Sequence, residues 1–340
     1  MVKKMRATNL FSYATSELSQ DAFICWLLSH ASKDGWDEDP QLRECACEFL
    51  DNILQSKNFC FKASMRAEVK KQYKNIDVLV VLDDIYIIIE DKKFTSVHND
   101  QINRYKDTLI KEGVRADNII CVFYKILEQA SPEKNVDFEY TREILLDLFR
   151  TYNQLSCNQN PIFRDYLEYL EYVEDKVKSY QFLPIEDWSS DSYIGFFTHL
   201  KKSVFKDEEV SWGYVSNPSG GFMGLWWFDI LDSQRLNDIG LTEELCDELY
   251  LQLEDNIITV KYALEDRKYK ERKYDMDEIQ AIRWKIYDYF KSELGDSFVK
   301  KPFKSGQYMT IGYMKYTEKN YKEVFSRLKN TLLNLDLRTL

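Results

Sequence analysis

The stretch "IDVLVVLDDIYIIIEDKKFTSVHNDQINRY", residues 76–105, decides the fold. Two apolar runs, 76–82 and 85–89, flank an Asp-Asp pair, which is the pattern of a tight hairpin between two β-strands. The second run is apolar on both faces, so we expect it to be a central, buried strand. It ends in the charged residues EDKK. Charges at the end of a central strand are costly unless they are paired or bind an ion.

The charged end of this strand brings acids and a lysine together. Side chains alternate along a strand, so Glu90 and Lys92 project to one side of the sheet while Asp91 points to the other. In the hairpin register Asp77, at the start of the preceding strand, lies close to Glu90 and Lys92. Carboxylates are oxygen ligands that Mg²⁺ prefers, and a lysine beside them can orient or help deprotonate water. The arrangement is the outline of a metal-dependent site for phosphodiester hydrolysis.

The flanking sequence predicts the elements around this hairpin. Helical periodicity returns over 97–111 and places Gln101 and Tyr105 on one face, from which they could reach the same site or a nearby phosphate. The other predicted elements of this half are a helix over 17–31 with Ser19 as its N-cap, a helix over 40–56, a strand over 59–69, and a buried strand over 118–127. The order is helices, three strands, helix, strand.

At these residues the sequence resembles the PD-(D/E)XK nuclease superfamily, whose core is a helix, three strands, a helix and a strand. The motifs of that superfamily are resembled here by Glu17, Asp77, Glu90-Asp91-Lys92 and Gln101-x-x-x-Tyr105. The last of these resembles the signature of RecB-type nucleases. Together with "ELSQDAFICWLL", the hairpin is most similar to a group of uncharacterised bacterial members. The resemblance covers residues 10–125, and Ile76 replaces the proline of the motif's name.

The resemblance implies a site and an activity. Mg²⁺ or Mn²⁺ would be held by Asp77, Glu90 and the backbone carbonyl of Asp91, with Glu17 as an outer acidic ligand and Lys92 as the catalytic lysine. The implied activity is a metal-dependent nuclease, with DNA favoured over RNA, and by analogy a setting in restriction, repair or phage defence. The alternative is a catalytically inactive module of the same fold that binds nucleic acid or scaffolds a complex.

Length and composition give the wider organisation. A chain of 340 residues is comfortable for two domains. We place the boundary in "QFLPIEDWSSDS" (181–192), which gives a nuclease domain over 1–183 and a second domain over 184–340. The overall class is α/β (α+β), because helices and strands are also interspersed in the second half. No motif identifies the second domain, which could recognise substrate, effector or partner protein, or form a homodimer.

The net charge of −11 argues against a protein that coats itself with nucleic acid, yet basic islands remain. The island at 62–74 supplies Lys70, Lys71 and Lys74 as candidate nucleic-acid contacts, with a merely solvated face as the alternative. Glu44 and Glu68 are further acids that could face the site, although Glu68 could instead pair with Lys70 or Arg66.

Several other classes are disfavoured by composition. The seven cysteines form no C-x-x-C pair and the three histidines are scattered, which indicates buried thiols rather than disulfides or zinc. The apolar runs are too short to cross a membrane and the N-terminus lacks the apolar region of a signal peptide, so we expect a cytoplasmic protein. In the second half, Trp226 and Trp227 lie on opposite faces of a predicted strand, and core packing is favoured over base stacking for both.

Overall fold

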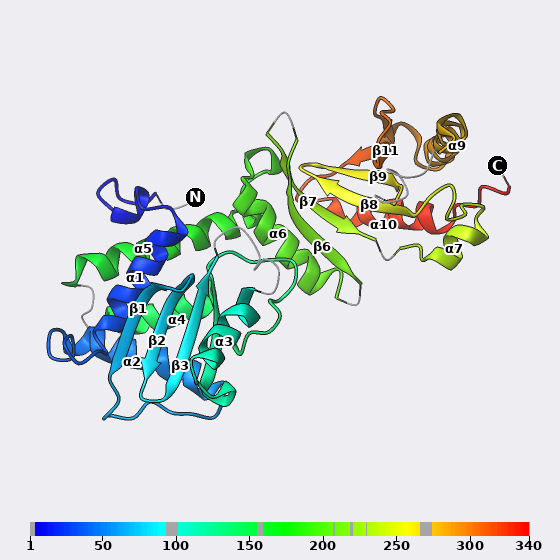
Figure 1. Ribbon diagram of the computed structural model, residues 1–340. Helices are drawn as coiled ribbons and strands as arrows, with labels where there is room; N and C mark the ends of the chain where they lie inside the picture. The colour runs from blue at the N-terminus through cyan, green and yellow to red at the C-terminus, as the bar shows by residue number, and fades with distance from the viewer. Residues whose placement is uncertain are drawn as a thin grey trace. The chain divides into compact units, whose positions relative to one another are not determined.

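The computed structural model describes residues 4–92, 101–154, 159–206, 208–217, 220–228, 230–265 and 274–339. The chain divides into two compact units, Val2–Lys176 and Val177–Leu340 (Figure 1). Each unit has its own β-sheet, so the mixed α and β class predicted from the sequence is confirmed. None of the described helices has both the length and the apolar character needed to cross a membrane.

The first unit is built on a five-stranded sheet with the strand order β1-β2-β3-β4-β5. β1, β2 and β3 are antiparallel, whereas β4 and β5 run parallel to β3. The strands are β1 (Ala67–Tyr73), β2 (Ile76–Leu82), β3 (Ile85–Asp91), β4 (Ile119–Lys125) and β5 (Phe138–Thr141). β3 is therefore central, as its unbroken apolar run predicted.

The predicted hairpin is confirmed. Leu82 pairs with Ile85 and Val78 pairs with Ile89, which leaves only the two aspartates in the turn. Asp83 takes a positive φ of 53°, a conformation that short polar side chains tolerate in tight turns. The same register brings the first residues of β2 opposite the last residues of β3.

The start of the first strand was predicted wrongly. We expected a strand over 59–69, but β1 begins at Ala67 and continues to Tyr73. The turn that follows β1 sets its register. Tyr73 pairs with Ile76 across this turn, and the ladder continues to the pair Ala67 and Leu82. The strand is consequently the polar run AEVKKQY, and its charged residues suit an edge strand, where unpaired backbone groups must be protected.

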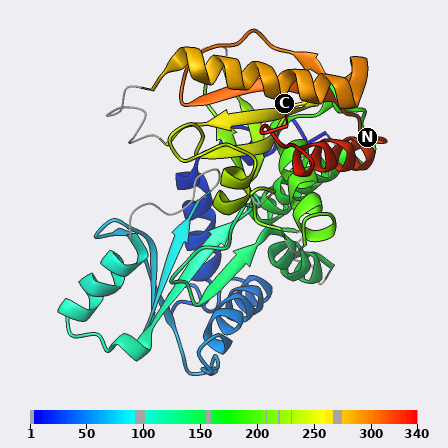
Figure 2. The ribbon, with the colours of Figure 1, turned by 90° about the vertical axis from the view of Figure 1, so that its right-hand side faces the viewer.

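Helices cover both faces of this sheet. α3 packs on β3 and β4 from one side, and α2 packs on β4 from the other, which Figure 2 shows. The helices are α1 (Glu17–Ser29), α2 (Pro40–Gln55), α3 (Gln101–Lys111), α4 (Arg142–Gln154) and α5 (Pro161–Val177), with 3₁₀ turns at Leu10–Ser12 and Ala116–Asn118. The predicted N-cap at Ser19 is wrong: Ser16 is the extended capping residue, which places Glu17 in the first turn, where a negative charge is favourable.

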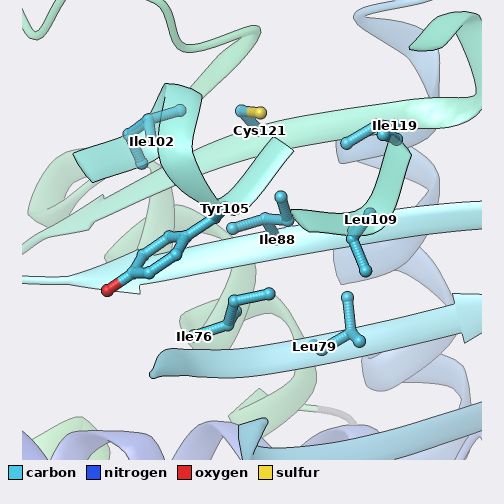
Figure 3. Packing of buried hydrophobic residues seen from close by; sticks show 8 residues of the cluster. All are labelled: Ile76, Leu79, Ile88, Ile102, Tyr105, Leu109, Ile119 and Cys121. Carbon is cyan, nitrogen blue, oxygen red and sulfur yellow. The ribbon is translucent and has the colours of Figure 1, made fainter. Parts of the chain in front are cut away.

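A hydrophobic cluster fixes α3 against the sheet (Figure 3). Ile102, Tyr105 and Leu109 recur at intervals of three and four residues on one face of the helix. They pack on side chains from three strands, namely Ile76, Leu79, Ile88, Ile119 and Cys121. This packing determines which side of α3 faces the charged ends of the strands. The predicted start of this helix near Val97 lies outside the described residues.

The second unit has a six-stranded antiparallel sheet in the order β10-β11-β9-β8-β7-β6. Its strands are β6 (Val210–Val215), β7 (Phe222–Trp227), β8 (Glu248–Glu254), β9 (Ile257–Ala263), β10 (Val299–Lys300) and β11 (Tyr308–Lys315). Its helices are α6 (Ser190–Ser203), α7 (Ser233–Asp238), α9 (Met276–Leu294) and α10 (Tyr321–Leu333), with 3₁₀ turns at Lys178–Gln181, Ile185–Asp187 and Gly295–Ser297. Trp227 is buried against Phe205, whereas Trp226 is half-buried.

Candidate active site

Asp77, Glu90 and Lys92 meet at one end of the sheet of the first unit. The Nζ of Lys92 lies 2.7 Å from Oε1 of Glu90 and 3.9 Å from Oδ2 of Asp77. The backbone N–H of Asp91 also donates a hydrogen bond to Oδ2 of Asp77, at 3.2 Å. Hairpin pairing places the residues opposite one another, and strand alternation puts Glu90 and Lys92 on the same face. The structure thus brings together the three residues that the sequence pattern joined.

Burial shifts the pKa values of the charged groups in this cluster. The side chain of Glu90 is fully buried, whereas 14% of Lys92 and 19% of Asp77 is exposed. Burial raises the pKa of Glu90; the hydrogen bond from Lys92 opposes this rise, and the charge of Asp77 adds to it. For Lys92, burial lowers the pKa, but the contact with Glu90 outweighs it, so the pKa ends above its ordinary value. A positive charge beside Glu90 is therefore strongly favoured.

The donor set fits a hard divalent cation with few protein ligands. Oε2 of Glu90 is buried and accepts no hydrogen bond from the described residues. Within those same residues, no three histidine, cysteine or acidic side chains converge as a group able to enclose an ion. Mg²⁺ sites commonly use one or two carboxylates and complete their octahedron with water and substrate phosphates. Asp77 and Glu90 suit that kind of open site rather than a closed protein cage.

The carboxylate of Asp91 points to the other face of the sheet, as alternation predicted. Its two oxygens accept hydrogen bonds from Nε2 of Gln20 on α1, at 2.9 and 3.0 Å. Asp91 is 1% exposed and Gln20 is 2% exposed. Burial raises the pKa of Asp91 well above its ordinary value. The contact between Gln20 and the Asp91 carboxylate was missed by the sequence reasoning.

A second acid of α1 approaches the cluster and was also missed. Nε2 of Gln72 lies 3.3 Å from Oδ2 of Asp21 and 3.3 Å from Oδ1 of Asp77, so its amide bridges the two carboxylates. Asp21 is buried, and its pKa is raised to about 6, by burial first and then by the charge of Asp77. Asp21 follows Glu17 by four residues and so shares its helix face, which is a signal the sequence did contain.

Glu17 and Lys125 contribute charge at the same end of the sheet. Glu17 begins α1, and its negative charge raises the pKa values of Asp91 and Lys92. Lys125 ends β4 and is only 7% exposed; burial lowers its pKa to about 8, with Glu17 opposing the shift. The backbone N–H of Lys92 donates to the carbonyl of Tyr124, 3.2 Å away, which places Lys125 beside the strand end. A lysine closing a buried strand was the available signal for this residue.

Gln101 and Tyr105 approach the cluster from α3. Nε2 of Gln101 donates a hydrogen bond to the hydroxyl of Tyr105. Tyr105 as a whole residue is 7% exposed. Figure 3 shows this hydroxyl pointing toward the end of the sheet at which β2 begins. Burial raises the pKa of Tyr105; Gln101 opposes the rise, and the charges of Glu90 and Asp77 add to it. The Gln-x-x-x-Tyr pair therefore lies within electrostatic reach of the two acids.

The basic island of β1 is largely engaged with acids. Lys70 pairs with Glu68 at 3.1 Å, and Lys74 pairs with Glu112. Nζ of Lys71 lies 3.5 Å from the carbonyl of Leu18, and its charge lowers the pKa of Asp21. Of the three lysines proposed as nucleic-acid contacts, Lys71 is thus the one that approaches α1 and the acidic cluster.

Comparison with known proteins agrees with this geometry. A family model described as the PD-(D/E)XK nuclease superfamily matches residues 8–192, which is more than half of the chain. The probable serine/threonine-protein kinase irlB of Dictyostelium discoideum is 25% identical over 192 residues. That match covers 54% of this chain but 12% of the kinase, so the chain spans a small part of that relative's length. No solved structure matches the chain.

Proposed function

The chain belongs to the PD-(D/E)XK nuclease superfamily, and we propose that it is a metal-dependent nuclease that hydrolyses phosphodiester bonds in DNA. The proposal rests on one observation above all: the ammonium of Lys92 lies 2.7 Å from the fully buried Glu90 and 3.9 Å from Asp77, at the ends of adjacent strands. Two acids can hold a divalent cation that activates water, and a lysine beside them can orient that water.

Each residue of the set has a distinct proposed role. Asp77, Glu90 and the backbone carbonyl of Asp91 would hold Mg²⁺ or Mn²⁺, with Glu17 as an outer acidic ligand. When bound, the cation would polarise the phosphate and lower the pKa of water. Lys92 would orient the attacking water and stabilise the negative charge that develops on the phosphate. Its ammonium, anchored by Glu90, can donate a proton but cannot accept one.

The residues of α3 have a supporting role in this proposal. The Tyr105 hydroxyl already accepts a hydrogen bond from Gln101 and retains a proton of its own to donate. A raised pKa keeps the phenol neutral, so it can donate to a phosphate oxygen without adding negative charge near Glu90. Gln101 and Tyr105 would thereby position the backbone of the nucleic acid strand against the acids.

DNA is favoured over RNA, and a restriction, repair or phage-defence setting is proposed by analogy with the family. For the second unit we propose recognition of substrate, effector or a partner, including a second copy of the chain. The kinase activity in the name of the Dictyostelium relative is not proposed for this chain, because the match covers 12% of that protein.

The experiment that tests the function compares substrates and metals side by side. Purified protein is incubated with plasmid, linear double-stranded DNA, single-stranded DNA and RNA, each with Mg²⁺, Mn²⁺ or EDTA. We expect cleavage of DNA that EDTA abolishes and Glu90→Gln eliminates. Cleavage in EDTA, or equal cleavage by Glu90→Gln, would contradict the metal-dependent mechanism. Preferential cleavage of RNA would contradict the DNA assignment alone.

A catalytically inactive nucleic-acid-binding module is the second candidate function. The observation in its favour is that the ammonium of Lys92 lies 2.7 Å from the buried Glu90, so a structural lysine can neutralise this acid without a metal. This candidate predicts binding of DNA without cleavage in any divalent metal. It also predicts the same DNA affinity in Mg²⁺ and in EDTA, which gel-shift titration measures directly.

A further inference from the structure

Gln20 of α1 contacts Asp91 on the face of the sheet opposite to Glu90, where it can influence the geometry of Asp77, Glu90 and Lys92. Its Nε2 donates to both oxygens of Asp91, at 2.9 and 3.0 Å, across the face of the sheet opposite to Glu90. Both residues are almost completely inaccessible to solvent, with 2% and 1% of their surfaces exposed. A buried carboxylate that lost these donors would be left without compensation for its lost hydration.

The contact is specific to the donor end of the amide. Nε2 of Gln20 makes two hydrogen bonds, whereas its Oε1 makes none with the described residues. The orientation of the amide is therefore set by Asp91 and not by a general polar environment. A fixed amide on a rigid helix holds Asp91 at a defined position relative to α1.

The backbone transmits this position to the acids. Asp91 lies between Glu90 and Lys92, and its own N–H donates to Oδ2 of Asp77 at 3.2 Å. A shift of the Asp91 side chain moves the peptide units on both of its sides, and with them the 2.7 Å contact between Glu90 and Lys92. Because geometry at a reacting centre must be held closely, a small displacement is expected to cost rate.

We propose that Gln20 is a positioning residue, which holds the buried carboxylate of Asp91 and thereby fixes the relative placement of Asp77, Glu90 and Lys92. The inference rests on the proposed function for its effect on cleavage, but the linkage itself concerns only this chain's own residues. It assigns a task to the first helix beyond packing: the helix is the anchor against which the end of β3 is held.

The decisive variant is Gln20→Met, which keeps the length of the side chain and removes the donor. Residues that hydrogen-bond to the ligands of a metal typically contribute about 10- to 100-fold to metal affinity or activity. We expect kcat to fall by about this factor with KM nearly unchanged, and Mn²⁺ affinity by calorimetry to fall in parallel.

Rescue distinguishes positioning from simple stability. Gln20→Glu alone places two carboxylates together in a buried site and should lower the melting temperature strongly. Combined with Asp91→Asn, it restores an amide–carboxylate pair with the two groups exchanged, and kcat should return to within about threefold of the parent. The matched control is Gln252→Met in the second unit, where Nε2 of Gln252 donates to Oε1 of the buried Glu254 at 3.0 Å. That change should lower stability while kcat stays unchanged.

A readout independent of catalysis separates this inference from the proposed function. The amide resonance of Asp91, which reports its hydrogen bond to Asp77, should move in Gln20→Met and return in the exchanged double variant. If the parent protein cleaves no nucleic acid, the proposed function fails, and the resonance alone tests the linkage. An Asp91 resonance unchanged in Gln20→Met would overturn the inference, as would a Gln20→Met protein that is less stable yet retains full kcat and Mn²⁺ affinity.

Discussion

The ammonium of Lys92, the residue that directly follows β3, lies 2.7 Å from a carboxylate oxygen of Glu90 near the end of that strand. Glu90 is fully buried, so this lysine supplies positive charge to an acid that cannot reach water. A ligand and a proton-transfer group held this close are expected to respond differently to mutation, and the first two predictions use that difference.

Glu90→Ala should abolish Mn²⁺ binding and cleavage together. A cation site built on one or two protein carboxylates keeps little affinity when one of them is removed. Calorimetric titration of Mn²⁺, alongside a cleavage assay, measures both effects. Glu143→Gln, an exposed acid on α4, is the control and should change neither. Full metal affinity in Glu90→Ala would mean that the cation is held elsewhere.

Lys92→Ala should separate binding from catalysis. The change removes a cation beside the acids without removing a ligand, so Mn²⁺ and DNA should still bind. The rate should fall by about 10² to 10⁴, the usual contribution of a positioned acid or base. Lys57→Ala is the matched control, because Lys57 also makes a partly buried ion pair, 3.4 Å from Asp137, at the other end of β4. Cleavage by Lys92→Ala at the parent rate would make Lys92 structural.

The basic island predicts a change in salt dependence. Changing Lys70, Lys71 and Lys74 to glutamate should weaken DNA binding, with each lost phosphate contact reducing the log–log slope against salt by roughly 0.7 to 0.9. We expect Lys71→Glu alone to have the largest single effect, because Lys70 and Lys74 already pair with acids. Arg115→Glu, an exposed charge just before β4, is the control. An unchanged slope in the triple variant would leave the island as a solvated face.

Arg142 predicts a large loss of stability at a residue that has no role in the proposed chemistry. Its side chain is 5% exposed and lies 2.6 Å from both Glu128 and Glu174, so Arg142→Met would remove the positive charge that pairs with both acids. Removing one partner of a buried ion pair typically costs about 3 to 5 kcal/mol. Arg150→Met on the same helix breaks an exposed pair with Glu171 and should cost less than about 1 kcal/mol. Denaturant unfolding of both variants makes the comparison, and equal losses would contradict the assignment.

Glu254 predicts part of the acid sensitivity of the second unit. Burial raises its pKa, but Lys261 and Lys301 outweigh this effect, so the folded-state pKa lies below the ordinary value. A depressed carboxyl pKa stabilises the fold above the unfolded pKa, and this stabilisation is lost as pH falls through the folded value. Glu254→Gln should therefore flatten the dependence of melting temperature on pH in the acidic range. An identical slope in the variant and the parent would assign the acid sensitivity to other groups.

The predictions from sequence were most successful where contacts are local. The hairpin of β2 and β3 follows from a two-residue turn and alternation, and both are visible within residues 76–92. The start of β1 was missed because its register comes from pairing with β2 and not from its own composition. Gln20, Asp21 and Gln72 were missed because the contact of Gln20 with Asp91 and that of Asp21 with Gln72 join distant parts of the chain. A buried amide has no periodicity that marks it beforehand.

The turn between Leu82 and Ile85 has a consequence for how this chain can vary. Side chains on a strand alternate, so the side of the sheet that each acid occupies depends on whether the number of residues in the turn is odd or even. One inserted residue, with the pairing upstream retained, would exchange the environments of Glu90 and Asp91. Every residue of the cluster would still be present in the sequence. The number of residues between the turn and the acids therefore determines which face each acid occupies. Exchanging one apolar residue of β3 for another leaves that number unchanged, whereas a single insertion does not.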